Sequence, residues 1–359
     1  MKRNKYNLKE FNQINELIQR QKLYSECFPK TKNTQLSSQK YYHWKFNSNL
    51  NRIKPFEYIL LRNNEMVGYY AAIIYEYLYD NKKINAGMVC DVMVSPNFQR
   101  EGLFSNLGTF SLNEMKQKGL DFTLGNPIKK YITKAHIKVG WENLFHIPLY
   151  IKFVGSRSIL TKLKLTIFSI IFNFFLNIYN FILKTLFKSK QYKVNEHSLD
   201  EFLELDGIEE FYDKFNRSNK ISLIKSNNFL RWRFSRPDKK YKFLVIFDND
   251  KIAAYAIICI SKISNMDMVA IVDLVSLDIK YIYSLIESIN IIAKEKKIDL
   301  ISIMLNKKYV KKYRLFNYGF LRSPYGYDFI LNNLSNKFSG ALLNNQKNWH
   351  ISWSNFDDH

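Results

Sequence analysis

Apolar and polar positions alternate along the chain in a pattern that occurs twice. Residues 59–74 and residues 244–259 align without a gap, and each reads as an apolar strand, a polar turn and a second apolar strand. Two apolar runs joined by a short turn rich in asparagine and aspartate are typical of a β-hairpin. The sequence therefore predicts two hairpins, with turns at Asn63-Asn64 and Asp248-Asn249.

The segments around each hairpin also correspond, in the same order. Upstream lies a helix-like segment with an aromatic core. Downstream lies a strand with one acidic residue inside it, followed by a helix, a short strand, a lysine-rich helix and a glycine-aromatic pair. The corresponding segments are residues 42–46 and 230–234, Asp91 and Asp273, and Gly140-Trp141 and Gly319-Phe320. This order favours a duplicated unit, so we predict an α/β (α+β) fold with two tandem domains, each a mixed central sheet flanked by helices.

A long apolar segment separates the two copies. Residues 165–183 contain no charged residue and are long enough to consider a membrane span. Polar residues recur every three or four positions, however, which predicts one polar stripe along an amphipathic helix at 162–188. The stripe consists of Lys162, Thr166, Ser169, Asn173, Asn177, Asn180, Lys184 and Lys188. We expect this helix to be peripheral. Three arrangements stay open: packing between the domains, contact with a membrane surface, and a true membrane span.

These patterns predict four segments. They are an N-terminal domain at 1–156, an amphipathic helical linker at 157–193, a second domain at 194–332 and a tail at 333–359. The tail combines Trp349 and Trp353 with Asp357 and Asp358. Aromatic rings beside acids would suit a sugar that carries an amine, but we expect a frayed terminus.

Composition narrows the class of protein. Of the 359 residues, 47% are hydrophobic and 24% charged, which excludes general disorder. A net charge of +22 favours a nucleic acid, an anionic membrane surface or a phosphorylated small molecule as partner, although codon bias in an AT-rich genome accounts for it equally well. Three distant cysteines and six histidines without ligand spacing predict neither a disulfide framework nor a metal site. The basic N-terminus has no apolar stretch behind it, so we expect a cytoplasmic protein.

The candidate chemistry lies in residues 86–119. This segment reads as a strand, a turn at Ser95-Pro96, a loop with Gly102, and a helix from about Phe104 to Lys118. Such a loop directs several backbone N–H groups to one point, where the helix dipole favours negative charge. Gly102 lets the backbone approach a ligand closely, and Arg100 can add a charge-assisted contact. The segment therefore predicts a pyrophosphate site.

The residue order in this loop resembles the acyl-CoA signature of the GNAT acetyltransferase superfamily. After Val94-Ser95-Pro96 the chain reads Gln99, Arg100, Glu101, Gly102, Leu103 and Phe104. The match departs at Phe104, where the family has a small residue. The resemblance continues in Asn126, at the end of the next predicted strand, and in Gly140-Trp141, where the family has Gly-Phe.

The resemblance implies two tandem GNAT-like domains, with acetyl-CoA as the acyl donor and no metal. Two parallel strands would diverge and grip the pantetheine arm, to which Met93 and Val94 would offer backbone groups. Residues 99–105, which end in Leu103, Phe104 and Ser105, would hold the pyrophosphate. The second copy lacks the glycine loop, so we expect it to bind no acyl-CoA and to wall the acceptor pocket.

The resemblance also suggests the proton-transfer groups. The leaving thiolate must be protonated, and many GNAT enzymes use a tyrosine four residues before the Gly-Phe pair. His136 occupies that position here, and Tyr131 is the alternative; a solvent-facing helix residue is the competing interpretation of His136. Asp91, an acid in an apolar strand, could serve as a base, bind the acceptor's ammonium group or be architectural like Asp273.

Three functions stay open. The first is a tandem-GNAT N-acetyltransferase that acts on an amino sugar or nucleotide-linked amino sugar, because proteins with this arrangement often modify amino sugars of bacterial surface polysaccharides. The second is a Fem-type aminoacyl transferase, although that class does not keep the loop found here at 99–102. The third is a non-catalytic GNAT scaffold at the membrane surface. No motif that reads RNA or DNA occurs, so no specific nucleic acid partner is expected.

Overall fold

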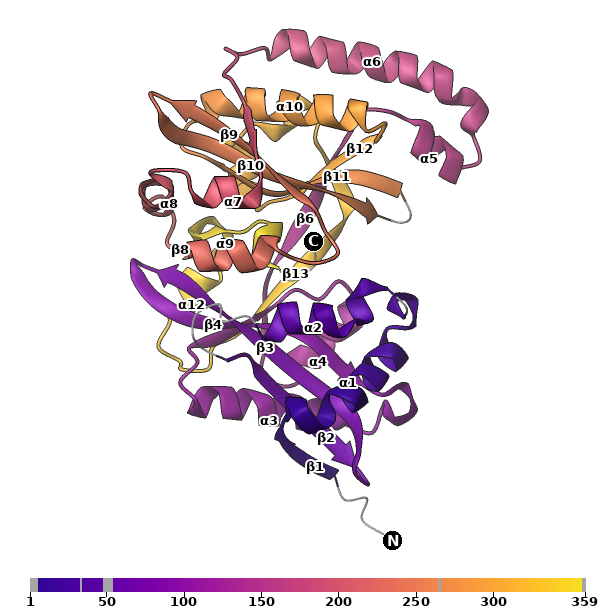
Figure 1. Ribbon diagram of the computed structural model, residues 1–359, viewed down its shortest axis with the longest axis vertical. Helices are drawn as coiled ribbons and strands as arrows, with labels where there is room; N and C mark the ends of the chain where they lie inside the picture. The colour runs from indigo at the N-terminus through magenta and orange to yellow at the C-terminus, as the bar shows by residue number, and fades with distance from the viewer. Residues whose placement is uncertain (1–5, 33, 48–53, 264–265, 357–359) are drawn as a thin grey trace. The chain divides into compact units, whose positions relative to one another are not determined.

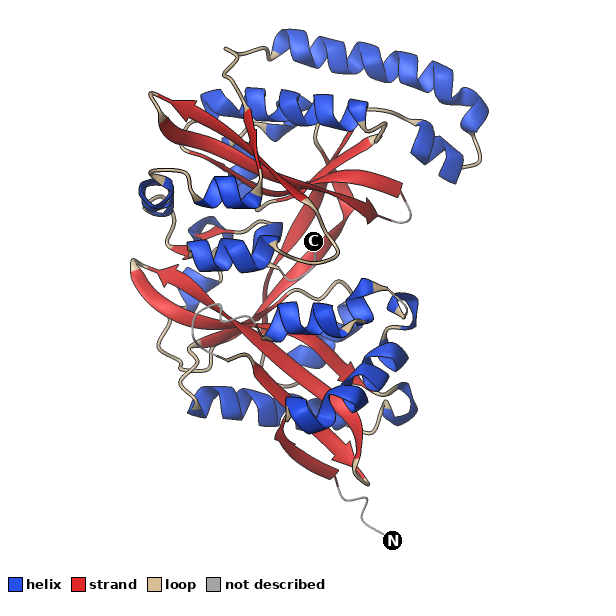
Figure 2. Ribbon diagram, viewed as in Figure 1, coloured by secondary structure: helices blue, strands red, loops and turns tan. Residues whose placement is uncertain are grey.

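The computed structural model describes residues 6–32, 34–47, 54–263 and 266–356, and consists of mixed β-sheets flanked by helices (Figure 1, Figure 2). The predicted α/β class is confirmed. The chain divides into two compact units. Unit 1 comprises residues 1–146, 236–238 and 328–345, and unit 2 comprises residues 147–235, 239–327 and 346–359.

The sheet of unit 1 begins as an antiparallel meander, after which β4 pairs in parallel with β5. Its strands in chain order are β1 (Tyr6–Glu10), β2 (Phe56–Arg62), β3 (Glu65–Tyr79), β4 (Lys82–Val94) and β5 (Phe122–Gly125). The main helices of unit 1 are α1 (Gln13–Cys27), α2 (Gln39–Phe46), α3 (Leu103–Gln117) and α4 (Lys130–Ile137).

The two faces of this sheet are packed differently. Tyr58, Tyr70 and Trp141 join residues of α3 in an apolar core on one face. Successive side chains of a strand point to opposite faces, so Glu57 lies on the other face, where its carboxylate meets Tyr42 of α2. This second face holds the buried charged residues of unit 1 that are described below.

Both predicted hairpins are confirmed. Asn63 and Asn64 have positive φ angles of 51° and 65° in the turn between β2 and β3. In the second copy, Asn249 and Asp250 have φ angles of 50° and 58°, so that turn lies one residue later than predicted. Two left-handed residues in a two-residue turn match the twist of the flanking strands, and asparagine and aspartate tolerate this conformation.

Unit 2 repeats the meander and the parallel pair. β9, β10 and β11 are antiparallel, and β11 pairs in parallel with β12. Its longer strands are β6 (Glu142–Phe153), β9 (Tyr241–Asp248), β10 (Lys251–Ile263), β11 (Met266–Ser276), β12 (Leu300–Met304) and β13 (Leu321–Asn332). β6 begins in unit 1, and β13 continues into it. The strands β7 (Asn195–His197), β8 (Ile221–Leu223) and β14 (Trp349–His350) are short. Its helices are α5 (Arg157–Lys162), α6 (Ser169–Leu186), α7 (Leu199–Leu203), α8 (Ile208–Asn216), α9 (Asn227–Phe234), α10 (Ile282–Glu295) and α11 (Lys307–Lys312), and α12 (Gly340–Leu343) belongs to unit 1.

The last strand of each copy pairs outside its own copy. Residues 149–153 of β6 pair with β12, whereas residues 330–332 of β13 pair with β5. The compact units therefore differ from the predicted segments 1–156 and 194–332. Strand periodicity shows which residues form a strand but carries no information about which sheet the strand joins.

The helix predicted at 162–188 is interrupted, so its predicted start is wrong. α5 ends at Lys162, and Lys164 then adopts a left-handed conformation with φ 59°. The N–H of Leu165 donates to the carbonyl of Leu160, and that of Lys164 donates to Thr161. These two bonds form a Schellman motif, which ends a helix. A short 3₁₀ turn then leads into α6.

The expectation of a frayed tail is wrong for its described part. Trp349 and Trp353 are buried, and Ser352 forms a β-bridge with Leu305, directly after β12. The Ser352 hydroxyl also donates to Asp273 of β11. The tail thus contacts both strands of the parallel pair of unit 2, while Asp357 and Asp358 lie outside the described residues.

Candidate active site

β4 of unit 1 runs beyond its parallel pairing with β5, which itself ends at Gly125. Pairing between β4 and β5 ends at Met88 and Leu124, although β4 continues to Val94. The pairing of β4 with β3 shifts register near Asp91, which has a φ angle of 49°. A β-bulge bends its strand locally, so β4 changes direction near Asp91. We call the region beyond the paired residues, between the ends of β4 and β5, the splay; Met93 and Val94 lie on its β4 side.

The loop after β4 presents the backbone at the N-terminus of α3. Arg100 and Gly102 are left-handed, with φ angles of 69° and 77°, and Gly102 is the N-cap residue. No described side chain caps the helix, so the N–H groups of Leu103, Phe104 and Ser105 have no partner within it. Unpaired N–H groups and the helix dipole together favour a phosphate group at this point.

The side chains of the loop leave this point open to an anion. Gln99 and Arg100 are exposed. The carboxylate of Glu101 accepts a 2.6 Å hydrogen bond from the hydroxyl of Tyr6 and lies 3.4 Å from the guanidinium of Arg62. These partners hold the negative charge of Glu101, so only its backbone is left to serve a phosphate.

Asn126 follows β5 directly, on the other side of the splay. Its side-chain oxygen and nitrogen are both buried, and neither has a hydrogen-bond partner among the described residues. A buried amide without partners costs about 1–3 kcal/mol, so such a group points to a ligand. An amide both donates and accepts, which matches the amide groups of a pantetheine arm.

His136 is buried, so the interpretation as a solvent-facing residue is wrong. Its ring lies edge-on to Phe104 at 5.0 Å and to Trp141 at 5.1 Å between centroids. Phe104, which departs from the family signature, thus fills space between α3 and α4. Burial lowers the pKa of His136, and Nδ1 donates to the carbonyl of Ile132 at 3.0 Å. A neutral ring with its proton on Nδ1 can accept a proton at Nε2 but cannot donate one there.

Tyr131 lies in the first turn of α4, five residues after Asn126. Its side chain is 65% exposed. A phenol hydroxyl is a hydrogen-bond donor. His136 already uses its Nδ1 proton on the carbonyl of Ile132, so the hydrogen-bonding roles favour Tyr131 over His136 as a proton donor.

Asp91 is held in a buried ion-pair network. Its carboxylate lies 2.6 Å from Arg20 and 2.9 Å from Lys45. These two cations hold the pKa of Asp91 below its usual range even though burial opposes ionisation. Asp273, its counterpart in unit 2, is likewise buried and paired with Lys225. Because both oxygens of Asp91 are engaged, the structure favours the architectural interpretation over a base.

Sequence reasoning missed a polar cluster on the same face. The carboxylate of Glu57 accepts hydrogen bonds from Tyr42, at 2.9 Å, and from Tyr69. Burial raises the pKa of Glu57 to about 6, although both hydrogen bonds oppose this shift. Tyr69 pairs with Met93 in the sheet, so the cluster adjoins the part of β4 that lines the splay. The sequence did offer one signal for this cluster, because Glu57 is an acid next to the apolar run of the first hairpin.

Replacing Gly102 with glutamate is expected to weaken acetyl-CoA binding at least tenfold, which is about 1.4 kcal/mol. The substitution puts a negative charge where the N–H groups of α3 converge. The matched control is Gly207→Glu, because Gly207 also has φ 77°, also caps a helix and also has open space around it. Titration calorimetry with acetyl-CoA on both variants separates the effect of the added charge from that of backbone strain. Equal affinities of the two variants for acetyl-CoA would show that the site is not in this loop.

Comparison with protein families relates unit 1 to known acetyltransferases. Residues 9–143 match the family model of an acetyltransferase (GNAT) domain. The matched residues all belong to unit 1, and they make up less than half of the chain. A comparison with curated protein sequences finds no significant match. Among the described residues, no group of three histidine, cysteine, aspartate or glutamate side chains could hold a metal ion.

Solved structures of N-acyltransferases, one of them given as probable, share the fold across nearly the whole chain. A probable N-acyltransferase from Enterococcus faecalis and a GCN5-related N-acetyltransferase from Anabaena variabilis each superpose with a TM-score of 0.63 at 12% identity, covering 92% of this chain and 73% of theirs. Saccharomyces cerevisiae N-myristoyltransferase with bound myristoyl-CoA and inhibitors gives a TM-score of 0.59 at 11% identity, covering 91% of this chain and 80% of its own. At these identities the likeness shows a common fold.

Proposed function

We propose that this protein transfers an acetyl group from acetyl-CoA to a primary amine in the splay of unit 1. The unpartnered amide of Asn126 carries this proposal, because it lies in the splay and matches a pantetheine amide. The uncapped N-terminus of α3 supports it as a place for the pyrophosphate. Unit 1 therefore offers a group for each polar part of the donor.

The proposed reaction is direct attack. The amine nitrogen forms a bond to the thioester carbonyl carbon, and the carbon–sulfur bond breaks. The amine loses a proton and the thiolate gains one. The sequence predicted His136 as the proton donor, whereas the hydrogen bond of its Nδ1 to Ile132 favours Tyr131. Glu57 is a candidate acceptor of the amine's proton, because a base with a pKa near 6 is ionised at neutral pH.

If Glu57 accepts this proton, kcat/KM falls as the pH drops through about 6, because protonation removes the base. We expect this limb of the pH profile to disappear in Glu57→Gln, together with most of the activity. Rates measured from pH 5 to 8 with the wild type and the variant test this. The same limb in an active Glu57→Gln protein would assign the titration to another group.

We propose an amino sugar or nucleotide-linked amino sugar, of the kind used in bacterial surface polysaccharides, as the acceptor, and the cytoplasm as the compartment. The net charge of +22 suits a phosphorylated acceptor. The proposal gives unit 2 no cofactor. The C-terminal tail supports the absence of a second donor site, because Ser352 bridges to Leu305 beside the parallel pair of unit 2. A Fem-type transferase and a non-catalytic scaffold stay the alternatives.

Thiol release from acetyl-CoA in the presence of an amine panel tests the proposed function. The panel includes nucleotide amino sugars, free amino sugars and aminoglycosides. We expect release that depends on one class of amine in the wild type and in Gly207→Glu, and little release in Gly102→Glu. Binding of acetyl-CoA without release by any amine would favour a different acceptor class. No binding at all would favour the scaffold alternative.

A further inference from the structure

α6 turns its polar stripe toward unit 2. The side-chain oxygen of Asn173 accepts from the backbone N–H of Ser156 at 2.8 Å, and the side-chain nitrogen of Asn180 donates to the carbonyl of Phe153 at 3.2 Å. The ammonium group of Lys184 lies 2.6 Å from Glu287 of α10. The polar residues thus fix which side of the helix faces the protein.

The remaining circumference of α6 is apolar and exposed. The side chains on it, with exposed fractions from 41% to 80%, are Ile170, Ile171, Phe172, Phe174, Phe175, Ile178, Tyr179, Phe181, Ile182 and Leu186. By length and composition, α6 could cross a membrane, and none of it is buried. An apolar surface this continuous is typical of a binding site for a membrane or a partner.

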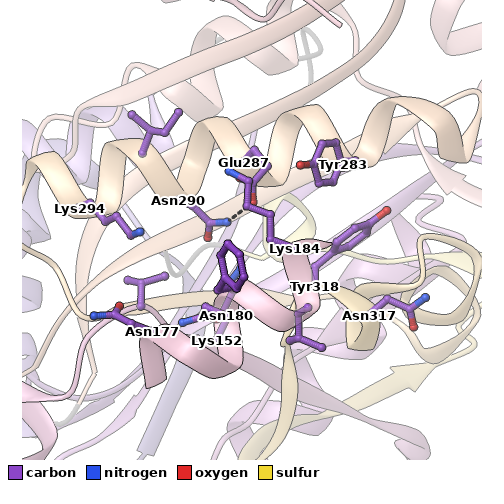
Figure 3. Close-up of a pocket in the computed structure, with 14 residues that line it drawn as sticks. Lys152, Asn177, Asn180, Lys184, Tyr283, Glu287, Asn290, Lys294, Asn317 and Tyr318 are labelled. Atoms are coloured by element: carbon purple, nitrogen blue, oxygen red, sulfur yellow. Dashed lines mark hydrogen bonds and ion pairs between the residues drawn. The ribbon is translucent and has the colours of Figure 1, made fainter. Parts of the chain in front are cut away.

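A cavity of about 510 Å³ lies between α6 and α10 (Figure 3). Lys152, Lys184 and Lys294 line it together with asparagine and tyrosine side chains and with Glu287, whose carboxylate is paired with Lys184, so the lysines are in excess. Phe181 and Ile291 also line it, and both are exposed. The cavity therefore has a positively charged lining that borders the apolar surface of α6. A lipid with an anionic head group and apolar chains matches this arrangement.

Several polar groups of the cavity lack partners among the described residues. The side-chain oxygens of Asn180 and Asn290 and the hydroxyl of Tyr283 are buried without a hydrogen bond, and Asn290 is only 9% exposed. Lys152 is only 5% exposed, and no ion-pair partner for it is found in the described part of the chain. Burial lowers the pKa of Lys152 to about 8, so it stays largely protonated at neutral pH.

We propose that this cavity binds the head group of an anionic glycerophospholipid while the apolar face of α6 lies in the same leaflet. Phosphate oxygens would accept from Lys152 and Lys294, and head-group hydroxyls would donate to the oxygens of Asn180 and Asn290. The helix, about 27 Å long at 1.5 Å per residue, would lie in the plane of the interface. The proposal concerns unit 2 alone and does not depend on acyl transfer.

Charge favours a lipid surface over a second copy of the chain. Residues 157–195 contain seven lysine and arginine residues and no aspartate or glutamate. Two such segments would repel each other if they met face to face, whereas an anionic leaflet attracts them. The apolar face also covers most of the helix circumference, which suits immersion in a leaflet better than a narrow helix–helix seam.

Sedimentation with vesicles tests the proposal on the full-length protein. One preparation contains phosphatidylcholine alone, and the other contains three parts phosphatidylcholine to one part phosphatidylglycerol. We expect binding to the second, at least tenfold weaker binding to the first, and release by high salt or carbonate. Equal binding to both would overturn the head-group site, and extraction by detergent alone would show a spanning helix instead.

Variants separate the cavity from the apolar face. Lys152→Met is expected to weaken binding to the mixed vesicles at least tenfold, whereas Lys251→Gln, which removes an exposed charge from the same unit, is expected to have little effect. Phe174→Ser changes only an exposed side chain of α6 and should also weaken binding if the protein inserts this face. Unchanged binding by Phe174→Ser and Lys152→Met would overturn the proposal.

Two further outcomes concern other occupants. Binding of soluble glycerol 3-phosphate without binding to vesicles would assign the cavity to a free phosphate compound. Formation of dimers in the absence of vesicles, abolished by Phe174→Ser, would assign the apolar face to a second copy of the chain. Either result contradicts a lipid ligand.

Discussion

Replacing Asp91 with asparagine is expected to lower the free energy of unfolding by about 3–5 kcal/mol. The carboxylate of Asp91 is the shared partner of Arg20 and Lys45, both of which are buried. The variant leaves two cations in the interior of unit 1 without a counter-charge. Asparagine tolerates the left-handed conformation that Asp91 adopts, so the backbone contributes little to the loss.

Urea unfolding at neutral pH measures this loss. The matched control is Asp80→Asn, because Asp80 also has a positive φ angle, 46°, but is exposed. The pKa of Asp91 is lowered in the folded protein, so its stabilisation is present above the pKa of an unfolded aspartate and is lost as the pH falls through the folded value. The difference between wild type and variant should therefore shrink in acid. A loss below about 1 kcal/mol at neutral pH would contradict a buried network of this kind.

Replacing Tyr131 with phenylalanine is expected to lower kcat by about 100-fold or more, since a general acid contributes roughly 10²–10⁴-fold. The affinity for acetyl-CoA should change little, because protonation of the thiolate matters only in the transition state. His136→Phe should instead act through packing, because the ring of His136 contacts Phe104 and Trp141.

Steady-state rates and calorimetric affinities of both variants decide between the two residues. Tyr325→Phe, which removes another exposed phenol, serves as the control. If His136→Phe lost more than 100-fold in kcat at unchanged acetyl-CoA affinity while Tyr131→Phe lost less than threefold, His136 would be the general acid after all.

Local features of the fold could be predicted from the sequence. The hairpins follow from apolar runs around left-handed asparagine and aspartate turns, such as Asn63-Asn64. The left-handed N-cap at Gly102 follows from a glycine between a strand and a helix. In each case, neighbouring residues in the chain determine the conformation.

Features that depend on distant contacts could not be predicted. Nothing in the residues of β13 shows that their partner is β5. His136 reads as a residue of a lysine-rich helix, yet Phe104 and Trp141 bury it. Glu57 resembles any acid in a strand until Tyr42 and Tyr69 are placed beside it. The sequence showed the polar stripe of α6. It did not show that the stripe faces the rest of unit 2, because that depends on contacts with Ser156, Phe153 and Glu287.

A crystal structure of the protein with bound acetyl-CoA tests the central claim most directly. We expect one molecule per chain, with its pyrophosphate at the N–H groups of residues 103–105 and a pantetheine amide bonded to Asn126 between β4 and β5. Acetyl-CoA at residues 277–283 of unit 2, or an empty splay at saturating concentration in solution and in the crystal, would contradict the account.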